Sequence, residues 1–335
     1  MTEISKYISL KEYVPAGMPK ISNFELKTAS VDLKNQNEVM ILNEWISVDP
    51  YMRARMTEKK NYKEPFQIGE PMDGAAIGKV IKSNSNNFKE GDIVTSNFGW
   101  RDKFVTNEDN IKKIIAKDIP LTTYLGLLGM TGHTAYIGLF KMAEIKKNQT
   151  ILVSSAAGSV GSTVCQIAKM MGCKVFASTG SDEKVEWLKN ELKVDHAFNY
   201  KKIENLVLHF KDICPEGFDL YFDNVGGDFL ESAIFRMKNF GKIIICGRIS
   251  QMSSTTGTTG LKNMAHVLVK RLIIRGFLIF DHENETNDFE KDMTKWISEG
   301  KIKFKETIYE GIENAPKAFV DLLNGKNIGK MIVKV

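Results

Sequence analysis

One segment of the chain constrains its fold more than any other: residues 151–161, which read ILVSSAAGSVG. The apolar run predicts a short buried strand, and the small residues after it predict a tight turn that leads into a helix. The free N–H groups and the positive dipole end of that helix would face the turn and attract a phosphate group. Ala156 stands at the first position of the G-x-G-x-x-G pattern, while Gly158 and Gly161 keep the other two. This setting favours a pyrophosphate site over the alternative, a glycine turn that only joins two packed elements.

The region around this segment has the alternating pattern of an α/β fold. Helical segments separate short apolar runs, which lie at residues 150–154, 174–177, 197–198, 218–222, 242–246 and 272–280. Such alternation predicts parallel βαβ units and a doubly wound sheet. The first third of the chain is β-rich instead, with strands expected at 39–46 and 75–81. Between them, Asp49-Pro50 predicts a capped short helix over residues 51–56. A chain of 335 residues suits two domains of this kind.

The end of the second strand of the alternating region indicates the type of dinucleotide. An NAD site has an acidic residue there that binds the ribose hydroxyls, whereas residues 178–181 read STGS. Lys184 follows on the first turn of the next helix, where its ammonium group would attract the 2′-phosphate that a carboxylate would repel. The pattern therefore favours NADP(H). Two questions about this site stay open. Asp182 and Glu183 are acids near the expected phosphate, although they can be simple N-terminal helix charges, and Lys184 can be a solvated surface lysine instead of a phosphate ligand.

Polar and small residues also close the fourth and fifth strands. Asn224 precedes Gly226 and Gly227 after one strand, and Cys246 precedes Gly247 after the next. Ligands of a doubly wound sheet lie across these carboxyl ends, so Asn224 is a candidate for contact with the cofactor ribose or nicotinamide. A simple turn asparagine is the alternative. Cys246 is predicted to be a small buried residue rather than a nucleophile, because no histidine or other base stands near it in the sequence.

The composition argues against several other classes of protein. There are 46 basic and 41 acidic residues, a net charge of +5 with no basic stripe, so no nucleic-acid partner is expected. Residues 148–168 carry no charge, but their serines, threonines and glycines argue against a membrane span. The start lacks the apolar run of a signal peptide and the four cysteines form no C-x-x-C pair, which predicts a soluble cytoplasmic protein. Residues 1–132 contain neither Cys nor His, so no metal is expected.

Five motifs together resemble one enzyme superfamily. They are VDPYMR at 48–53, AAGSVG at 156–161, GSDEK at 180–184, YFDNVGG at 221–227 and NIGK at 327–330. The chain resembles the medium-chain dehydrogenase/reductase superfamily, in the zinc-independent branch of prostaglandin reductases, leukotriene hydroxydehydrogenases and alkenal double-bond reductases. The resemblance implies an α/β fold in which a Rossmann domain with a doubly wound parallel sheet, residues 126–299, is inserted into a GroES-like β-rich catalytic domain, residues 1–125 and 300–335. It also implies a homodimer formed through the sixth strand, near residues 277–280.

The same resemblance implies a set of contacts with NADP(H). By expected role, the contacts are Gly158, Ser159, Val160 and Gly161 at the pyrophosphate; Lys184 at the 2′-phosphate; Tyr200 near the adenosine; Asn224 near the ribose; Met130 and Thr134 under the nicotinamide; Cys246, Gly247, Ile249, Ser250, Phe277, Leu278 and Ile279 around the nicotinamide pocket; and Asn327 from the C-terminal segment.

The reaction that the resemblance implies is NADPH-dependent reduction of the carbon–carbon double bond of a small α,β-unsaturated aldehyde or ketone, an enal or enone. Hydride would add to the β-carbon, and a hydrogen-bond donor near the carbonyl oxygen would stabilise the negative charge that develops there. Some relatives use tyrosines for this, at positions where this chain has Met252 and Val269. Tyr51 is the remaining side-chain candidate; a ribose hydroxyl of the cofactor is the other candidate donor, and Tyr51 would then only pack. A quinone reductase and a non-catalytic NADPH-binding protein are the alternative functions.

Overall fold

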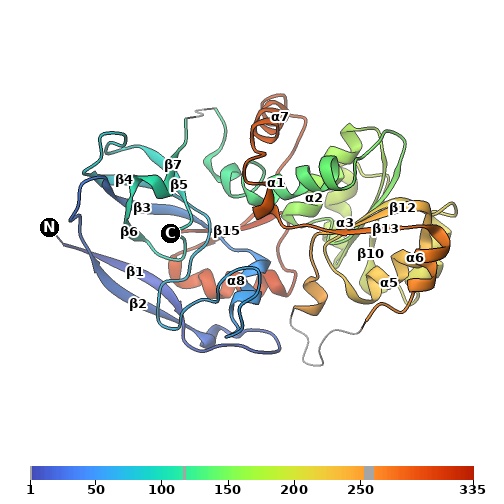
Figure 1. The fold of residues 1–335 in the computed structure, drawn as a ribbon, viewed down its shortest axis with the longest axis horizontal. Coiled ribbons are helices and arrows are strands. Elements are labelled where there is room, and N and C mark those ends of the chain that lie inside the picture. Colours follow the sequence, from blue (N-terminus) through green and yellow to red (C-terminus); the bar gives the residue numbers. More distant parts are fainter. Residues whose placement is uncertain (1, 116–117, 253–259) are drawn as a thin grey trace. The chain divides into compact units, whose positions relative to one another are not determined.

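The structure, a computed structural model, describes residues 2–115, 118–252 and 260–335. These residues form two compact units, and Figure 1 labels many of their elements. Unit 1 comprises Met1–Leu125 and Glu306–Val335, and unit 2 comprises Gly126–Lys305. In the sequence, unit 2 is therefore an insertion within unit 1. Among the helices of the described residues, none has the length and apolar character needed to cross a membrane.

Unit 1 is built mainly from antiparallel strands. Its strands are β1 (Glu3–Leu10), β2 (Phe24–Val31), β3 (Glu38–Ser47), β4 (Ala76–Ser83), β5 (Ile93–Ser96), β6 (Lys103–Asn107), β7 (Ile111–Lys113), β14 (Glu306–Glu310) and β15 (Lys330–Lys334). β1 and β2 form a two-stranded sheet, and the others form a seven-stranded sheet in the order β14-β15-β3-β4-β5-β7, with β6 also paired to β3. β14 and β15 are parallel, and β15 joins β3 antiparallel, so the C-terminal segment completes this sheet.

The main core of unit 1 includes side chains from α8 (Ala315–Leu323) and from a short 3₁₀ helix, Pro50–Arg55. The sequence predicted a short helix here, but the expected cap is wrong, because the Asp49 side chain makes no capping hydrogen bond. Its carboxylate binds Lys330 Nζ at 2.8 Å instead and accepts the hydroxyl of Ser47. A buried ion pair between residues far apart in the sequence thus replaces the local cap.

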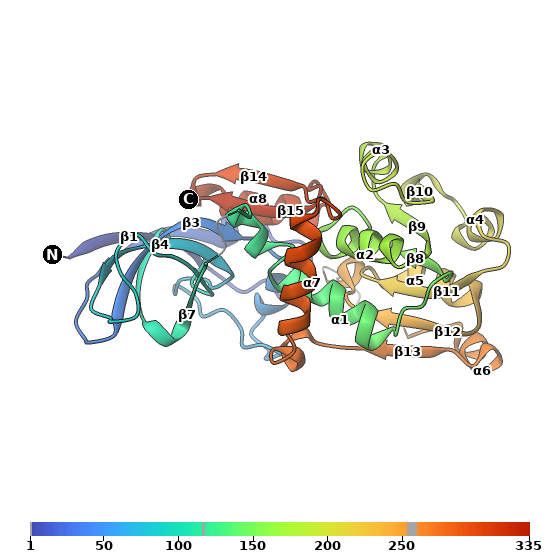
Figure 2. The same ribbon diagram turned by 90° about the horizontal axis from the view of Figure 1, so that it is seen from above.

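Unit 2 contains a sheet of six parallel strands. They are β8 (Thr150–Val153), β9 (Lys174–Thr179), β10 (His196–Asn199), β11 (Phe218–Asp223), β12 (Met237–Ile245) and β13 (Ile273–Gly276). Their order is β10-β9-β8-β11-β12-β13, which can be followed in Figure 2. Every neighbouring pair is parallel. The order reverses between β8 and β11, and the carboxyl ends of strands at such a switch point are where open α/β sheets bind ligands.

Helices cover both faces of this sheet. They are α1 (Met130–Ile137), α2 (Ser159–Met170), α3 (Asp182–Asn190), α4 (Leu206–Ile213), α5 (Gly227–Arg236), α6 (Met264–Lys270) and α7 (Asn287–Ser298). Ile151 and Val153 of β8 belong to a core with side chains from α1, α2, α3 and α7. Leu152, between them, belongs to a second core with α4 and α5. Successive strand residues point to opposite faces, so burial of both faces explains why β8 is an unbroken apolar run.

The sixth strand is shorter than the sequence suggested. β13 ends at Gly276 instead of continuing to residue 280, and Ile279–His282 forms a 3₁₀ turn. The reason is the length of the neighbouring strand. Gly276 pairs with Ile245, the last residue of β12, so residues after Gly276 have no residue of β12 to pair with. Other short helical turns of the described chain are Ile21–Asn23, Glu108–Asn110, Leu121–Leu125, Gly138–Met142, Tyr200–Lys202, Ile249–Gln251 and Ile312–Asn314.

Candidate functional site

The glycine turn follows the carboxyl end of β8, at the switch point of the sheet. Gly158 is the N-cap residue of α2, and no side chain of the described residues caps this helix. Its first N–H groups therefore need another partner. A Cβ on Gly161 would lie 2.4 Å from the carbonyl oxygen of Ser155, so only glycine fits at that position. Residues 158–161 form the backbone cradle that an anion such as pyrophosphate requires.

A buried polar network holds Asn224 at the same place. The Asn224 side chain donates to the carbonyl oxygen of Ser154 at 2.8 Å, and its backbone N–H donates to Ser154 Oγ at 2.9 Å. The Tyr221 hydroxyl donates to Asp223 Oδ1 at 2.5 Å, and this oxygen also accepts two backbone N–H groups of the following turn. Asp223 Oδ2 is buried with no hydrogen-bond partner among the described residues, and burial raises the pKa of this carboxyl group. The sequence analysis missed this network, although three polar residues at two strand ends were a visible signal.

Residues 246–250, after β12, are tied to the same turn. The N–H groups of Cys246 and Gly247 both donate to the carbonyl oxygen of Asp223, at 2.8 and 3.0 Å. The Ile249 N–H and Ser250 Oγ donate to carbonyl oxygens of the turn after β11, at 3.3 and 2.6 Å. Burial raises the pKa of the Cys246 thiol to about 12, so the thiol is protonated at neutral pH. A protonated thiol is a weak nucleophile, which fits a small lining residue.

Met130 and Thr134 lie one turn apart on α1. Thr134 Oγ1 donates to the carbonyl oxygen of Met130 at 2.7 Å. In the same helix, Thr131 Oγ1 lies 2.7 Å from Ser159 Oγ, at the start of α2. The first turns of α1 and α2 are therefore joined by hydrogen-bonded hydroxyl groups, and the residues that were predicted to lie under the nicotinamide and at the pyrophosphate belong to neighbouring helices.

The segment 277–279 follows the end of β13. Phe277 and Ile279 pack against the core that contains α1 and α2, while Leu278 is 39% exposed. Gly138, just after α1, makes room for Phe222 and for this segment, since a Cβ there would lie 2.6 Å from Phe222 Cε2 and 3.2 Å from Phe277 Cζ. Two of the three predicted pocket residues thus point into unit 2, and the third points outward.

Lys184 and Tyr200 lie at the carboxyl ends of β9 and β10. Ser181 caps α3 by accepting the N–H of Lys184. The Lys184 side chain is half-buried; burial, followed by the positive charge of Lys201, lowers its pKa. Tyr200 Cε1 lies 3.4 Å from where a Cβ on Gly180 would be. The ring therefore reaches across from the end of one strand to the end of the next.

The acid that the sequence left in doubt, Asp182, is engaged elsewhere. Its carboxylate accepts Lys202 Nζ at 2.6 Å and Asn199 Nδ2 at 3.0 Å. These contacts, and the hydrogen bond from Lys202 above all, lower the pKa of Asp182. The carboxylate is held as a surface ion pair.

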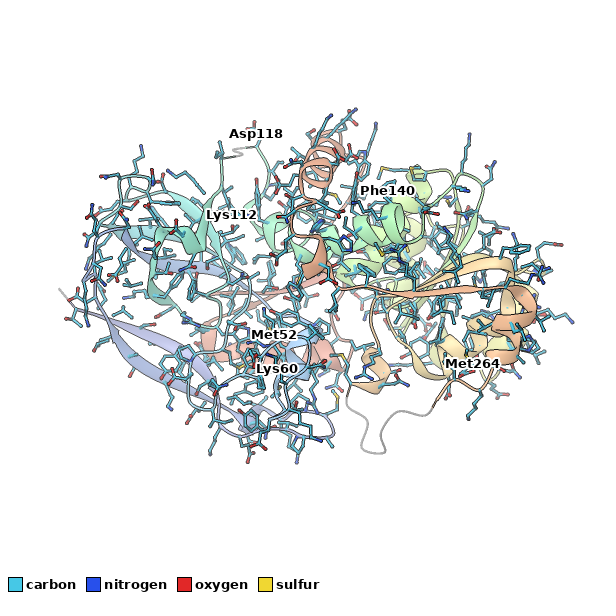
Figure 3. The ribbon with its side chains drawn as sticks, in the orientation of Figure 1. Met52, Lys60, Lys112, Asp118, Phe140 and Met264 are labelled. Atoms are coloured by element: carbon cyan, nitrogen blue, oxygen red, sulfur yellow. The ribbon has the colours of Figure 1, made fainter. Side chains whose placement is uncertain are left out.

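Tyr51 lies in unit 1, in the 3₁₀ helix Pro50–Arg55, next to the fully buried Met52 that Figure 3 labels. Burial, followed by the negative charges of Asp49 and Asp73, raises the pKa of Tyr51 far above its ordinary value. The hydroxyl therefore keeps its proton at any physiological pH and can act only as a neutral hydrogen-bond donor or acceptor. Lys63 Nζ lies 5.3 Å from the centre of the ring.

Asn327 also lies in unit 1, just before β15. The side chain is buried, and its Nδ2 donates to the carbonyl oxygen of Gly329 at 2.8 Å. This hydrogen bond closes the turn that leads into Lys330, whose Nζ also donates to the carbonyl oxygen of Val48 at 3.0 Å. The side-chain nitrogen of Asn327 is therefore hydrogen-bonded within its own turn.

Most of the predicted residues of unit 2 gather at one edge of its sheet. Hydrogen bonds join the end of β8 to Asn224, and the turn of Asn224 to residues 246–250. Lys184 and Tyr200 lie together at the ends of the next two strands. In the part of the chain that the structure describes, no three His, Cys, Asp or Glu side chains are grouped so that they could hold a metal ion.

Comparisons with known proteins extend this picture. Residues 6–114 match the family model for the N-terminal domain of oxidoreductases, and residues 159–299 match the model called zinc-binding dehydrogenase. A 2-alkenal reductase (NADP(+)-dependent) from Nicotiana tabacum is 40% identical over 336 residues, which cover 99% of this chain and 97% of that protein. Prostaglandin reductase 1 from Bos taurus is 42% identical over 334 residues, 98% and 99% of the two chains. The crystal structure of CurA from Vibrio vulnificus in complex with NADPH has a TM-score of 0.92 at 36% identity, covering 98% of this chain and 99% of that one.

The fold and these likenesses define the class of protein as an oxidoreductase with an inserted, doubly wound α/β unit. The chain belongs to the medium-chain dehydrogenase/reductase superfamily, in the branch of the alkenal and prostaglandin reductases. The resemblance drawn from the five sequence motifs is thereby confirmed, and so is the predicted fold class.

Proposed function

We propose that the protein uses NADPH to reduce the carbon–carbon double bond of α,β-unsaturated aldehydes or ketones. The names of its relatives support this, since they specify NADP-dependent alkenal reduction and prostaglandin reduction, and one similar structure contains NADPH. In this chain, one observation carries the proposal: the N-terminus of α2, which no side chain of the described residues caps, follows a glycine turn at the switch point of a parallel sheet. That arrangement suits the pyrophosphate of a dinucleotide better than any other common ligand.

The residues at this edge fit NADPH. A pyrophosphate can approach the backbone of Gly158–Gly161, where a side chain at position 161 would instead meet the oxygen of Ser155. Lys184 would bind the 2′-phosphate, and Asp182 would not repel it, because Asp182 is already neutralised by Lys202. The further contacts that we assign to the cofactor are Tyr200 at the adenosine; Asn224 at the ribose; Met130 and Thr134 under the nicotinamide; Cys246, Gly247, Ile249, Ser250 and Phe277–Ile279 around it; and Asn327 from unit 1.

When bound, NADPH supplies the hydride that adds to the β-carbon of the substrate, and a proton from solvent or from a relayed hydroxyl group completes the α-carbon. The chain itself contributes position and electrostatics. The network of Ser154, Tyr221 and Asp223 holds Asn224 and residues 246–250 in place, so little reorganisation is needed when ligands bind. Rigid support of this kind keeps reacting atoms at productive distances, which is a large part of the rate enhancement for a transfer between two bound molecules.

We assign to Tyr51 the role of hydrogen-bond donor to the carbonyl oxygen of the substrate. Negative charge develops on that oxygen as hydride adds, and a nearby hydroxyl group lowers the barrier by donating to it. The neutral state of Tyr51, enforced by burial and by Asp49 and Asp73, suits a donor that does not itself ionise. In this account residues 1–125 and 300–335 form the catalytic domain and residues 126–299 the NADP-binding domain. Zinc takes no part, since residues 1–132 offer no Cys or His ligand.

The test is a panel of electron acceptors with NADPH: an alk-2-enal, a simple enone, a quinone and an oxo-eicosanoid. We expect the enal or enone to speed the loss of NADPH absorbance and to yield the saturated aldehyde or ketone. Turnover with the quinone alone would show a quinone reductase. Tight NADPH binding without turnover of any acceptor would show a non-catalytic binding protein.

We also propose a cytoplasmic homodimer. In the part of the chain that the structure describes, β13 is an edge strand paired only with β12, and Ile273 on it is 51% exposed. An exposed apolar edge is a template for pairing with a second copy of the same strand. All four cysteines are free, which fits a reducing compartment. Analytical ultracentrifugation is expected to give twice the monomer mass, and a monomer at micromolar concentration would contradict the dimer.

A further inference from the structure

Lys201 lies beside Gly180, at the carboxyl ends of β9 and β10, and its positive charge acts on Lys184. Lys201 belongs to the 3₁₀ turn Tyr200–Lys202, directly after β10. Its Cε and Nζ atoms lie 3.3 and 3.6 Å from where a Cβ on Gly180 would be. Lys184 belongs to the first turn of α3, which begins just after Gly180. The positive charge of Lys201 is close enough to lower the pKa of Lys184.

Such a pair of like charges costs free energy unless an anion lies between them. The neighbouring acids offset it only in part. Glu183 opposes the effect of Lys201 on Lys184, but more weakly. Asp182 is committed to Lys202 Nζ at 2.6 Å and to the side chain of Asn199. Lys201 therefore brings positive charge to the edge of the sheet where ligands of this fold bind.

The next residue provides an internal contrast. Lys201 and Lys202 share the same short turn and are both exposed. Lys202 forms an ion pair with Asp182, whereas Lys201 extends over Gly180 toward Lys184. Gly180 permits this, because any side chain there would press against both Lys201 and Tyr200. The absence of a side chain at position 180 thus gives the Lys201 ammonium group access to the strand edge.

We propose that Lys201 is a second ligand of the 2′-phosphate and that, with Lys184, it sets the preference of the enzyme for NADPH over NADH. This inference rests on the proposed function, in that NADPH is the cofactor. A 2′-phosphate carries a charge of about −1.5 to −2 at neutral pH, so one lysine balances only part of it. Two ammonium groups balance it fully and donate to different phosphate oxygens.

The experiment measures binding without any electron acceptor. Wild type, Lys201→Met, Lys184→Met and the matched control Lys202→Met are titrated with NADPH, NADH and 2′,5′-ADP, and binding is followed by fluorescence or calorimetry. Methionine keeps an apolar stem of similar length and removes only the charge. We expect Lys201→Met to raise the Kd for NADPH and for 2′,5′-ADP by about tenfold, the change that loss of one charge-assisted hydrogen bond produces. Its Kd for NADH should not change. Lys202→Met, which frees the carboxylate of Asp182, should weaken the binding of NADPH and 2′,5′-ADP less than Lys201→Met does, and Lys201→Arg should restore NADPH binding.

Each other outcome has a definite meaning. A Lys201→Met variant that binds NADPH as tightly as wild type, or that loses NADPH and NADH equally, overturns the role of Lys201. Equal wild-type affinity for NADPH and NADH overturns both this role and the cofactor of the proposed function. A wild-type protein that discriminates between the cofactors through Lys201 but reduces no enal or enone supports the inference and contradicts the proposed reaction.

Discussion

The two ends of the six-stranded sheet in unit 2 differ in how their charges are satisfied. At the amino ends of the strands, Asp219 accepts the N–H of Thr150 at 2.8 Å and Asp195 accepts the N–H of Val175 at 2.7 Å. Each carboxylate also pairs with a lysine at 2.9 Å. Every charge named here has a partner within the protein, and the strand ends are fixed by those partners.

At the carboxyl ends of the same strands, by contrast, some polar groups lack such partners among the described residues. Among the described residues, no side chain caps the N-terminus of α2, and Asp223 Oδ2 has no hydrogen-bond partner. Groups left in this state cost stability in the free protein. At the amino end these contacts stabilise the fold, and the contrast supports our proposal that the carboxyl end binds a ligand.

The largest effect is expected from filling the glycine cradle. Gly161→Ala places a Cβ 2.4 Å from a backbone oxygen that cannot move without opening the turn, so we expect loss of NADPH binding by about hundredfold or more. Gly158→Ala, with its nearest contact at 3.3 Å, should have a smaller effect. Gly276→Ala, where nothing lies within 4 Å, controls for a general effect of the added methyl group. Calorimetric titration with NADPH measures all three, and equal Kd values for the position 161 and 276 variants would refute the cradle.

Tyr51→Phe tests whether chemistry and cofactor binding reside in different residues. Removal of the hydroxyl should lower kcat for an enone by about tenfold to hundredfold, because the donor to the developing negative charge is lost. The Kd for NADPH should not change, since the carboxyl end of the sheet is intact. Tyr7→Phe, in the same unit, is the control, because its hydroxyl donates to the carbonyl oxygen of Gly69. Wild-type kcat in Tyr51→Phe would assign the donor to a ribose hydroxyl and leave Tyr51 a packing residue.

The pH dependence of the preference for NADPH over NADH tests whether positive charge at the carboxyl end of the sheet selects the cofactor. Burial, followed by the charge of Lys201, lowers the pKa of Lys184, so this lysine loses its proton at a lower pH than an ordinary surface lysine. The ratio of the Kd for NADH to the Kd for NADPH should therefore decline as pH rises toward that lowered pKa. It should also decline in acid, as the phosphate takes up a proton near its second pKa of about 6. Fluorescence titrations across this range measure the ratio, and a ratio that does not vary with pH would contradict charge-based selection.

The smallest effect on function is expected at the amino end. Asp219→Ala leaves the N–H of Thr150 and the ammonium group of Lys238 without their shared partner. We expect the free energy of unfolding to fall by about 1–3 kcal/mol, with no change in the Kd for NADPH. Denaturant unfolding and calorimetric titration give the two values. A variant of normal stability with weakened NADPH binding would reverse the roles assigned to the two ends.

The sequence predicts the glycine turn and the parallel sheet because their signals are local. A buried strand, small residues and a helix start follow one another within residues 151–161. The cap of α3 by Ser181 was readable for the same reason, since donor and acceptor lie three residues apart. Such features depend on neighbours in the chain, and their geometry follows from the residue types alone.

Features that depend on distant partners could not be predicted in this way. Asp49 has the local pattern of a helix cap, yet its carboxylate binds Lys330, which is 281 residues away. Lys201 and Lys202 are adjacent lysines, and only the fold shows that one pairs with Asp182 and the other extends over Gly180. The pairing of strands determines which of these side chains meet, and the periodicity of side chains along the sequence carries no information about that pairing.

The most direct test of the central claim, that the protein uses NADPH to reduce a conjugated carbon–carbon double bond, follows the transferred hydride. NADPH with deuterium at C4 of the nicotinamide is incubated with wild-type protein and a simple enone, and the product is analysed by mass spectrometry and NMR. The account predicts a saturated ketone with deuterium at the β-carbon. Deuterium at the carbonyl carbon of an alcohol, or no transfer from bound NADPH to the enone, would contradict it.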